Sequence, residues 1–78
     1  MFQQRLRSRR MKCGYTQQRM ADSLVISLNA YQKYEQGERF PPADTLVRIA
    51  DILECSIDYL LGRDDFLKSL GVSADVFR

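Results

Sequence analysis

Residues 16–37 read TQQRMADSLVISLNAYQKYEQG, and this stretch decides the fold. Its apolar residues recur at helical spacing on both sides of a break at residues 25–27, which predicts helices over 17–24 and 28–36. Thr16 and Ser27 stand where a helix N-cap is needed, and Gly37 can end the second helix. We therefore expect two short helices joined by a three-residue turn. Their buried faces should consist of Met20, Ala21 and Leu24 in the first helix and Ala30, Tyr31 and Tyr34 in the second.

The flanking sequence predicts three further helices. Residues 2–13 carry an apolar stripe and end at Gly14, residues 43–54 follow two prolines, and Ser56 can cap a short helix that Gly62 closes. We therefore expect an all-α protein in which residues 1–62 form a compact bundle of five short helices. Residues 63–78 form a C-terminal tail that could be partly helical. The apolar positions are Phe2, Leu6 and Cys13 in the first of these helices, Leu46, Val47, Ile49, Ala50 and Leu53 in the next, and Ile57, Tyr59, Leu60 and Leu61 in the last.

Charge is unevenly distributed along the chain. The net charge is only +2, yet residues 1–20 sum to +6 without any acid, and residues 41–60 sum to −3. An asymmetry of this kind gives a protein one positive face, which suits a polyanion such as DNA. A solvated basic helix would explain the same charges without any partner.

Several function classes lack their sequence signals. The chain has no histidine and no glycine-rich phosphate loop, so we expect neither an enzyme nor a cofactor. Cys13 and Cys55 lack further ligands at zinc spacing and read as small buried residues in a reducing cytosol, although a disulfide between them is possible. No apolar run approaches the roughly 20 residues that span a bilayer, and the N-terminus lacks a secretory apolar region, so we expect a cytoplasmic protein.

The stretch from Thr16 to Gly37 resembles the helix-turn-helix of the phage-repressor and Cro-like regulators, the XRE family. The flanks agree: RLRSRRMKCGYTQ at 5–17 is similar to the first helix of that family, and GERFPPADTLVRIADILECSIDYLLG at 37–62 to its fourth and fifth helices. The resemblance implies a lambda-repressor-like domain in which the second helix of the motif enters the major groove of duplex DNA.

The resemblance also implies roles for individual residues. Asn29 and Gln32 could each pair with adenine through a donor and an acceptor, and Leu28 could pack against a thymine methyl group. A solvated polar helix face would carry the same side chains. The positions expected near the DNA backbone are Gln17, Gln18, Lys33, Gln36, Arg39, Arg7 and Arg9.

Arg10 and Glu35 match positions that the family often pairs, so we expect an ion pair that ties the first helix to the recognition helix. Two positions depart from the pattern. Val25 stands where the family usually has glycine with positive φ, which would cost a β-branched residue about 1–2 kcal/mol, so the turn could instead take another shape. Arg9 stands where leucine is usual, and either its side chain reaches out to solvent or the first helix is rotated.

Together these features predict a sequence-specific, double-stranded DNA-binding transcriptional regulator, a repressor of the phage or prophage type. No small-molecule ligand is evident, and a homodimer is expected because a monomer of this size would bind weakly. The alternative is an antitoxin-like or protein-interaction helix-turn-helix module. Apolar tail residues could form the dimer contact or pack back on the core: Phe66, Leu67, Leu70, Val72, Val76 and Phe77.

Overall fold

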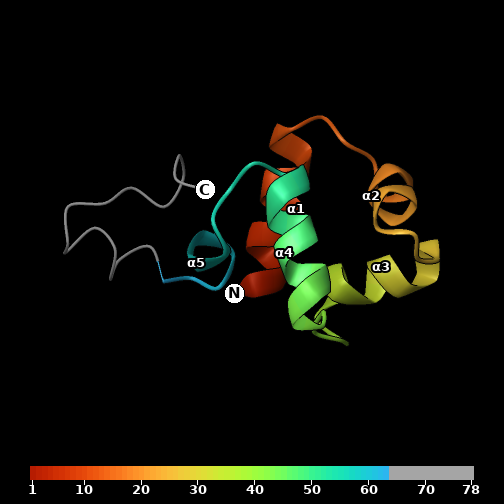
Figure 1. Ribbon diagram of the computed structural model, residues 1–78. Coiled ribbons are helices and arrows are strands. Elements are labelled where there is room, and N and C mark those ends of the chain that lie inside the picture. The colour runs from red at the N-terminus through yellow and green to blue at the C-terminus, as the bar shows by residue number, and fades with distance from the viewer. Residues whose placement is uncertain (64–78) are drawn as a thin grey trace.

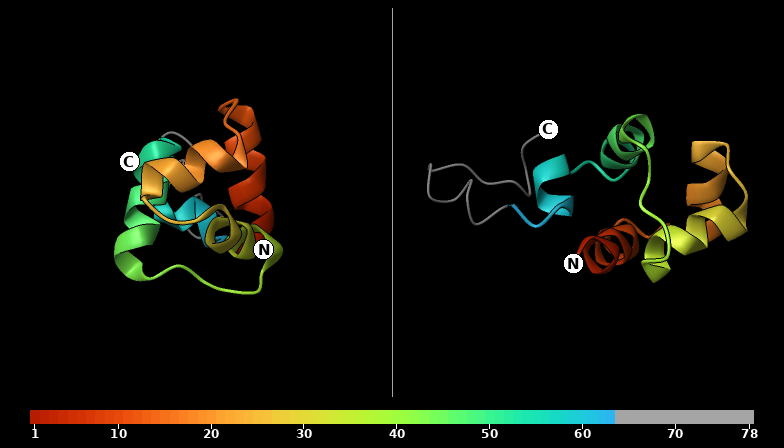
Figure 2. Two further views of the ribbon diagram at one scale, coloured as in Figure 1. Left: turned by 90° about the vertical axis from the view of Figure 1, so that its right-hand side faces the viewer. Right: turned by 90° about the horizontal axis from the view of Figure 1, so that it is seen from below.

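The computed structural model describes residues 1–63 and confirms a bundle of five helices without strands in that range. The helix pair α2 and α3 lies at one end, α1 and α4 lie in the middle, and α5 lies at the other end (Figures 1 and 2). The tail residues 64–78, with the contacts expected of them, lie outside the described residues. The helices are α1 (Phe2–Lys12), α2 (Gln17–Leu24), α3 (Leu28–Gln36), α4 (Ala43–Ile52) and α5 (Ile57–Leu60).

Three predicted N-caps are present. The hydroxyl oxygens of Thr16, Ser27 and Ser56 each accept a hydrogen bond at 3.0 Å from the backbone N–H three residues further on. Each cap satisfies one of the N–H groups that the first turn of a helix leaves without an intrahelical partner. These hydroxyls therefore set where α2, α3 and α5 begin.

The core lies where all five helices meet. Leu6, Met20, Tyr31, Ile49 and Leu53 are fully buried there. The predicted inner face of α2 is confirmed, as are Phe2 and Leu6 of α1, whereas Cys13 is only partly buried. The core positions predicted at Ala30 and Val47 are wrong, and the apolar residue Leu61 is not buried either. Ala30 is only partly buried, Val47 is 46% exposed and Leu61 is 38% exposed. In α4 the residues at positions 46, 49, 50 and 53 already complete one inward stripe, so Val47 falls outside it.

Val25 ends α2 in the left-handed conformation, with φ 57° and ψ 47°. Its N–H donates to the carbonyl of Asp22, and the N–H of Ile26 donates to the carbonyl of Ala21, which is the Schellman arrangement that normally uses glycine. The turn therefore keeps the shape expected of glycine, and the alternative of a different turn is wrong. The Val25 side chain is 80% exposed, so the strain of this conformation is not offset by burial.

Arg9 accounts for the other departure from the family pattern. Its Nε donates to the carbonyl of Leu53 at 2.9 Å, and its Nη2 donates to the carbonyl of Glu54 at 3.1 Å. Glu54 itself has φ 52°, so a second helix, α4, also ends on a non-glycine residue with left-handed backbone. The guanidinium of Arg9 satisfies the carbonyls that the end of α4 exposes, which is a structural role.

No disulfide joins Cys13 and Cys55. Cys13 is partly buried at the end of α1, and its thiol donates to the carbonyl of Leu53 over 3.7 Å. Cys55 is buried, as expected, and lies between α4 and α5. Within residues 1–63 no helix is both long and apolar enough to cross a membrane.

Candidate nucleic-acid interface

The helix pair α2 and α3 carries five carboxamide side chains. Gln17 is hydrogen-bonded to Gln32, and Gln17 and Gln36 line the same hollow. On α3 the spacing of residues 29, 32 and 36 puts three carboxamides on one side of the helix. We call this the amide face, and its members are Gln17, Gln18, Asn29, Gln32 and Gln36. Asn29, Gln18 and Gln36 are exposed, whereas Gln17 and Gln32 are partly buried. A carboxamide carries both a donor and an acceptor, so this face can match hydrogen-bonding groups in either sense.

The sequence places four further candidate residues around the amide face. Leu28 opens α3 and is partly buried, as is Lys33 one turn later. Arg7 on α1 and Arg39 after α3 are both exposed. None of these cations has lost its access to solvent, so each is able to meet a phosphate.

Arg10 and Glu35 form the ion pair that the sequence predicts. The Nε of Arg10 lies 2.6 Å from Glu35 Oε2, and its Nη2 donates to Oε1 at 3.2 Å, so the contact is bidentate. The Nη1 of Arg10 donates to the carbonyl of Tyr15 at 2.8 Å, which also fastens the loop between α1 and α2. The two side chains are only 11% and 3% exposed. This pair therefore links α1, the loop and α3 at one buried point.

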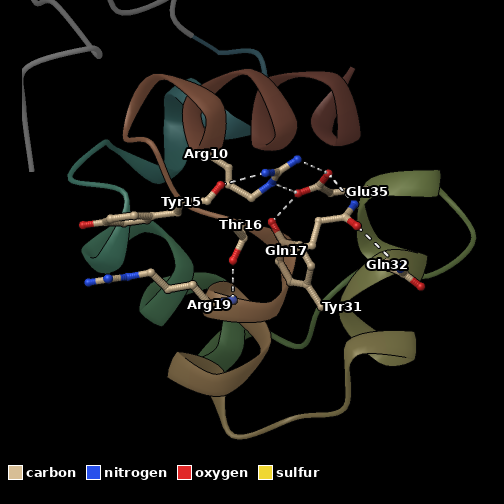
Figure 3. A network of polar contacts seen from close by, with 8 residues as sticks. All are labelled: Arg10, Tyr15, Thr16, Gln17, Arg19, Tyr31, Gln32 and Glu35. Carbon is tan, nitrogen blue, oxygen red and sulfur yellow. Dashed lines mark hydrogen bonds and ion pairs between the residues drawn. The ribbon is translucent and has the colours of Figure 1, made fainter.

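Two more donors complete the surroundings of the Glu35 carboxylate. The hydroxyl of Tyr31 donates to Oε2 and the Nε2 of Gln17 donates to Oε1 at 3.1 Å (Figure 3). Burial works against ionisation of Glu35, but the hydrogen bonds from Arg10, Tyr31 and Gln17 outweigh it and lower the pKa of this carboxyl below its ordinary value. Burial and the bond to Glu35 raise the pKa of Tyr31, so its hydroxyl remains a donor. At neutral pH the Glu35 carboxylate is therefore ionised, and its two oxygens accept four hydrogen bonds from Arg10, Tyr31 and Gln17.

Gln17 connects this network to the amide face. While its Nε2 donates to Glu35, its Oε1 accepts a hydrogen bond from Gln32 Nε2 at 3.2 Å. Figure 3 shows Gln17 between Glu35 and Gln32. The structure therefore brings together one residue expected near the DNA backbone and one expected to read bases.

A hollow of about 540 Å³ opens beside the N-terminus of α2. Its lining includes Arg7, Gln17 and Gln36, with the Arg10–Glu35 pair at its wall. The first turn of α2 directs backbone N–H groups and the positive end of the helix dipole toward this region. The combination of an arginine, two carboxamides and a helix N-terminus is chemically suited to an anion such as a phosphate.

Two residues expected near the DNA backbone have partners inside the protein. Gln18 donates its Nε2 to the Asp22 carboxylate at 2.8 Å, four residues along α2. Arg9 is engaged with the end of α4, as described above, because both of its bonds run to carbonyls. Arg9 therefore has structural partners within the protein, and the phosphate contact expected for it stays a prediction.

Sequence reasoning missed Tyr31 as a member of the network, because its helical spacing marked it only as core. The signal that could have revealed it is its position four residues before Glu35, where two side chains on a helix meet. It expected Gln17 near the DNA backbone but did not predict its hydrogen bonds to Glu35 and Gln32. The Gln17–Gln32 bond joins residues that are 15 positions apart, so no local pattern contains it.

Two capped helices, a tight turn between them and an exposed polar face on the second helix define a helix-turn-helix domain. The chain belongs to the helix-turn-helix family of phage-repressor and Cro-like (XRE) proteins, because the sequence profile described as "Helix-turn-helix" matches residues 6–60. No solved structure is significantly similar to it.

Curated relatives carry related names. The chain is 51% identical over 62 residues, 80% of its length, to the cryptic phage CTXphi transcriptional repressor RstR of Vibrio cholerae, of which it covers 55%. It is 42% identical over 64 residues, 82% of its length, to the HTH-type transcriptional regulator ImmR of Bacillus subtilis, of which it covers 50%. It is 48% identical over 61 residues, 78% of its length, to an uncharacterized SPbeta prophage-derived regulator, YonR, of the same organism, covering 56%. The chain thus spans about half the length of these relatives.

Proposed function

We propose that this protein is a sequence-specific, double-stranded DNA-binding transcriptional regulator that acts as a repressor of the phage or prophage type in the cytoplasm. The observation that carries the proposal is the amide face of α2 and α3. The Arg10–Glu35 ion pair fastens α3 to α1 beneath this face. The printed names of the relatives, which include a phage repressor and a prophage-derived regulator, support a regulator over a protein-interaction module or an enzyme.

The dimensions of α3 support entry into the major groove. An α-helix with its side chains is about 10–12 Å across, and the major groove of B-DNA is about 12 Å wide. Asn29 is exposed in the first turn of α3, and Leu28 and Gln32 flank it. We assign base contacts to these three residues because the N-terminal part of a recognition helix reaches deepest.

Phosphate contacts would position the domain on either side of the groove. We assign them to Arg7, Gln17 and Gln36 at the hollow beside α2, and to Lys33 and Arg39 near α3. Gln18 could assist at the edge of the same surface. These contacts carry little sequence information, but they set the register of α3 along the duplex.

We also propose that two copies act together. Two-fold dimers of this class read half-sites about 34–36 Å apart, one helical turn of DNA. The exposed apolar residues Val47 on α4 and Leu61 at the end of α5 support a contact between copies there. Sedimentation of the full chain at micromolar concentration should give a dimer, and a monomer throughout would contradict this part of the proposal.

Selection from a pool of random duplexes tests the central proposal. The wild-type chain should enrich one motif, and its affinity for that motif should fall with salt in proportion to the phosphates contacted. Asn29→Ala should weaken binding to the motif without changing the salt dependence. If no sequence is enriched and nothing binds at low salt, the protein-interaction alternative would be favoured instead.

A further inference from the structure

We infer that Arg19, stacked on Tyr15, is a further phosphate-binding residue that holds the duplex outside the bases read by α3. The inference rests on the proposed DNA-binding function and deepens it, because it adds a contact to the DNA that flanks the recognised motif. It starts from a cation in a place that the stability of α2 does not favour. Arg19 lies in the first turn of α2, three residues after the N-cap Thr16.

Arg19 breaks two local rules of helix stability. The positive end of the helix dipole lies at the N-terminus, so a carboxylate in the first turn is stabilising and a cation is not. The Thr16 hydroxyl accepts a hydrogen bond from the backbone N–H of Arg19 at 3.0 Å, which is half of a capping box. The other half would need glutamate or glutamine at position 19, with its side chain bonded back to the N–H of Thr16. Residues that break local rules in this way are expected at functional sites.

No acidic partner within the described residues accounts for the charge of Arg19. Its side chain is exposed, and no acidic side chain of residues 1–63 forms an ion pair with it. Its Cζ lies 4.5 Å from the centre of the Tyr15 ring. Tyr15 is packed against the core and its carbonyl accepts the hydrogen bond from Arg10, so the ring is a fixed platform. Stacking holds the guanidinium on this ring and leaves N–H groups at its edge for an acceptor outside the protein.

The position of the stack indicates which acceptor it meets. Tyr15 lines the hollow beside α2 that is suited to a phosphate, so Arg19 stands next to the wall of that hollow. Figure 3 shows Tyr15 and Arg19 on one side of Gln17, and Gln32 on the other. A DNA strand whose phosphates pass over the hollow therefore reaches the stack on the side away from α3. The acceptor is thus a phosphate of the flanking duplex, which the arginine fork can bind through two N–H groups.

Opposite effects on stability and on binding test the inference. Arg19→Glu completes the capping box and reverses the unfavourable charge, so the Tm should rise by about 2–8 °C. The same variant should bind the selected duplex at least about ten-fold more weakly, because a carboxylate then faces a phosphate. A residue with only a structural role would not move stability and affinity in opposite directions. An Arg19→Glu protein that binds as tightly as wild type would overturn the inference.

Arg19→Gln and Lys12→Gln form a matched pair, since each removes one exposed cation. Lys12 ends α1 and does not line the hollow. Arg19→Gln should make the slope of log affinity against log salt shallower by about one, because one phosphate contact is lost. Lys12→Gln should leave that slope unchanged. An equal reduction of the slope in both variants would show only an effect of net charge and would overturn the inference.

The role of the Tyr15 ring is tested by two substitutions. Tyr15→Phe keeps the ring and should bind like wild type. Tyr15→Leu removes the platform, so the Arg19 guanidinium must be ordered during binding, and affinity should fall by about two- to five-fold. If Tyr15→Phe is as weak as Tyr15→Leu, the hydroxyl rather than the stack makes the contact, and the assignment of the stack is wrong.

The length of the duplex tests where the contact lies. The selected motif is placed between flanks of about ten base pairs, one helical turn, or of about two. Shortening the flanks should weaken wild type about ten-fold but leave Arg19→Gln nearly unchanged, because that variant has already lost the outer phosphate. An equal loss in both proteins would overturn the inference while leaving the proposed function intact. If wild type enriches no motif at all, the proposed function fails before this inference is reached.

Discussion

Glu35→Ala should destabilise the protein severely, because four donors share the carboxylate that it removes. They are two nitrogens of Arg10, the hydroxyl of Tyr31 and the carboxamide of Gln17. The Arg10 side chain is 11% exposed, so its charge would be left with little water in place of its partner. Breaking a buried ion pair from one side costs about 3–5 kcal/mol.

That cost is large for a small domain. At about 0.05–0.15 kcal/mol per residue, a domain of this size has a total stability of about 4–12 kcal/mol. One kcal/mol lowers the Tm of such a domain by about 4–8 °C, so Glu35→Ala should lower it by at least about 12 °C. Thermal and urea unfolding, followed by circular dichroism at about 222 nm, where α-helices absorb characteristically, measure the change in Tm and in the free energy of unfolding.

Asn29→Ala is the matched control, because Asn29 lies on the same helix and is exposed. It should change stability by less than about 0.5 kcal/mol. A double variant, Arg10→Met with Glu35→Leu, should recover part of the loss because it leaves no buried charge. If Asn29→Ala destabilises the protein as much as Glu35→Ala does, the assignment of Glu35 as the structural anchor is refuted.

Three further results are expected. Burial opposes ionisation of Glu35, but hydrogen bonds lower its pKa below the ordinary 4.5, so its stabilising contribution is present above that pH and disappears as the pH falls through the folded pKa. The free energy of unfolding from urea melts between pH 7 and 3 should therefore fall more steeply for wild type than for Glu35→Gln. Parallel pH curves for the two proteins would contradict this. Val25→Gly should stabilise the fold by about 0.5–1 kcal/mol, since relief of left-handed strain exceeds the added flexibility of the unfolded chain; a lower urea midpoint would show that Val25 is unstrained. Arg9→Ala should cost about 1–3 kcal/mol of stability and leave the salt dependence of DNA binding unchanged. Arg7→Ala should instead lower the slope of log affinity against log salt by about one, with little effect on the melting temperature. If the two variants behave the other way round, Arg9 contacts the DNA backbone and Arg7 does not.

The helices were predictable because their signals are local. Thr16, Ser27 and Ser56 are cap residues that act on an N–H three positions away, and apolar spacing within one helix reports which face is buried. The Arg10–Glu35 pair came from the family resemblance, and the structure contains it. Local pattern and resemblance together therefore account for the fold and its main polar anchor.

Two further features, at Arg9 and at Val25, were flagged by the sequence but not resolved by it. Arg9 meets the carbonyl of Leu53 across 44 positions, and that contact exists only because α1 packs beside the end of α4. Val25 adopts a backbone conformation normally left to glycine because two hydrogen bonds close the end of α2 around it. A tertiary contact decides the role of Arg9, whereas local hydrogen bonds close the turn at Val25 against its residue preference. Single-sequence reasoning could flag both positions but not resolve them.

The central claim is that the amide face of α2 and α3 meets DNA. Nuclear magnetic resonance of the ¹⁵N-labelled chain, titrated with its selected duplex, tests this most directly because every backbone amide reports its own surroundings. The largest shifts should fall at residues 16–18 and 27–36, with residues 46–60 little changed. Shifts confined to α4 and α5, or none with a saturating duplex, would contradict the claim.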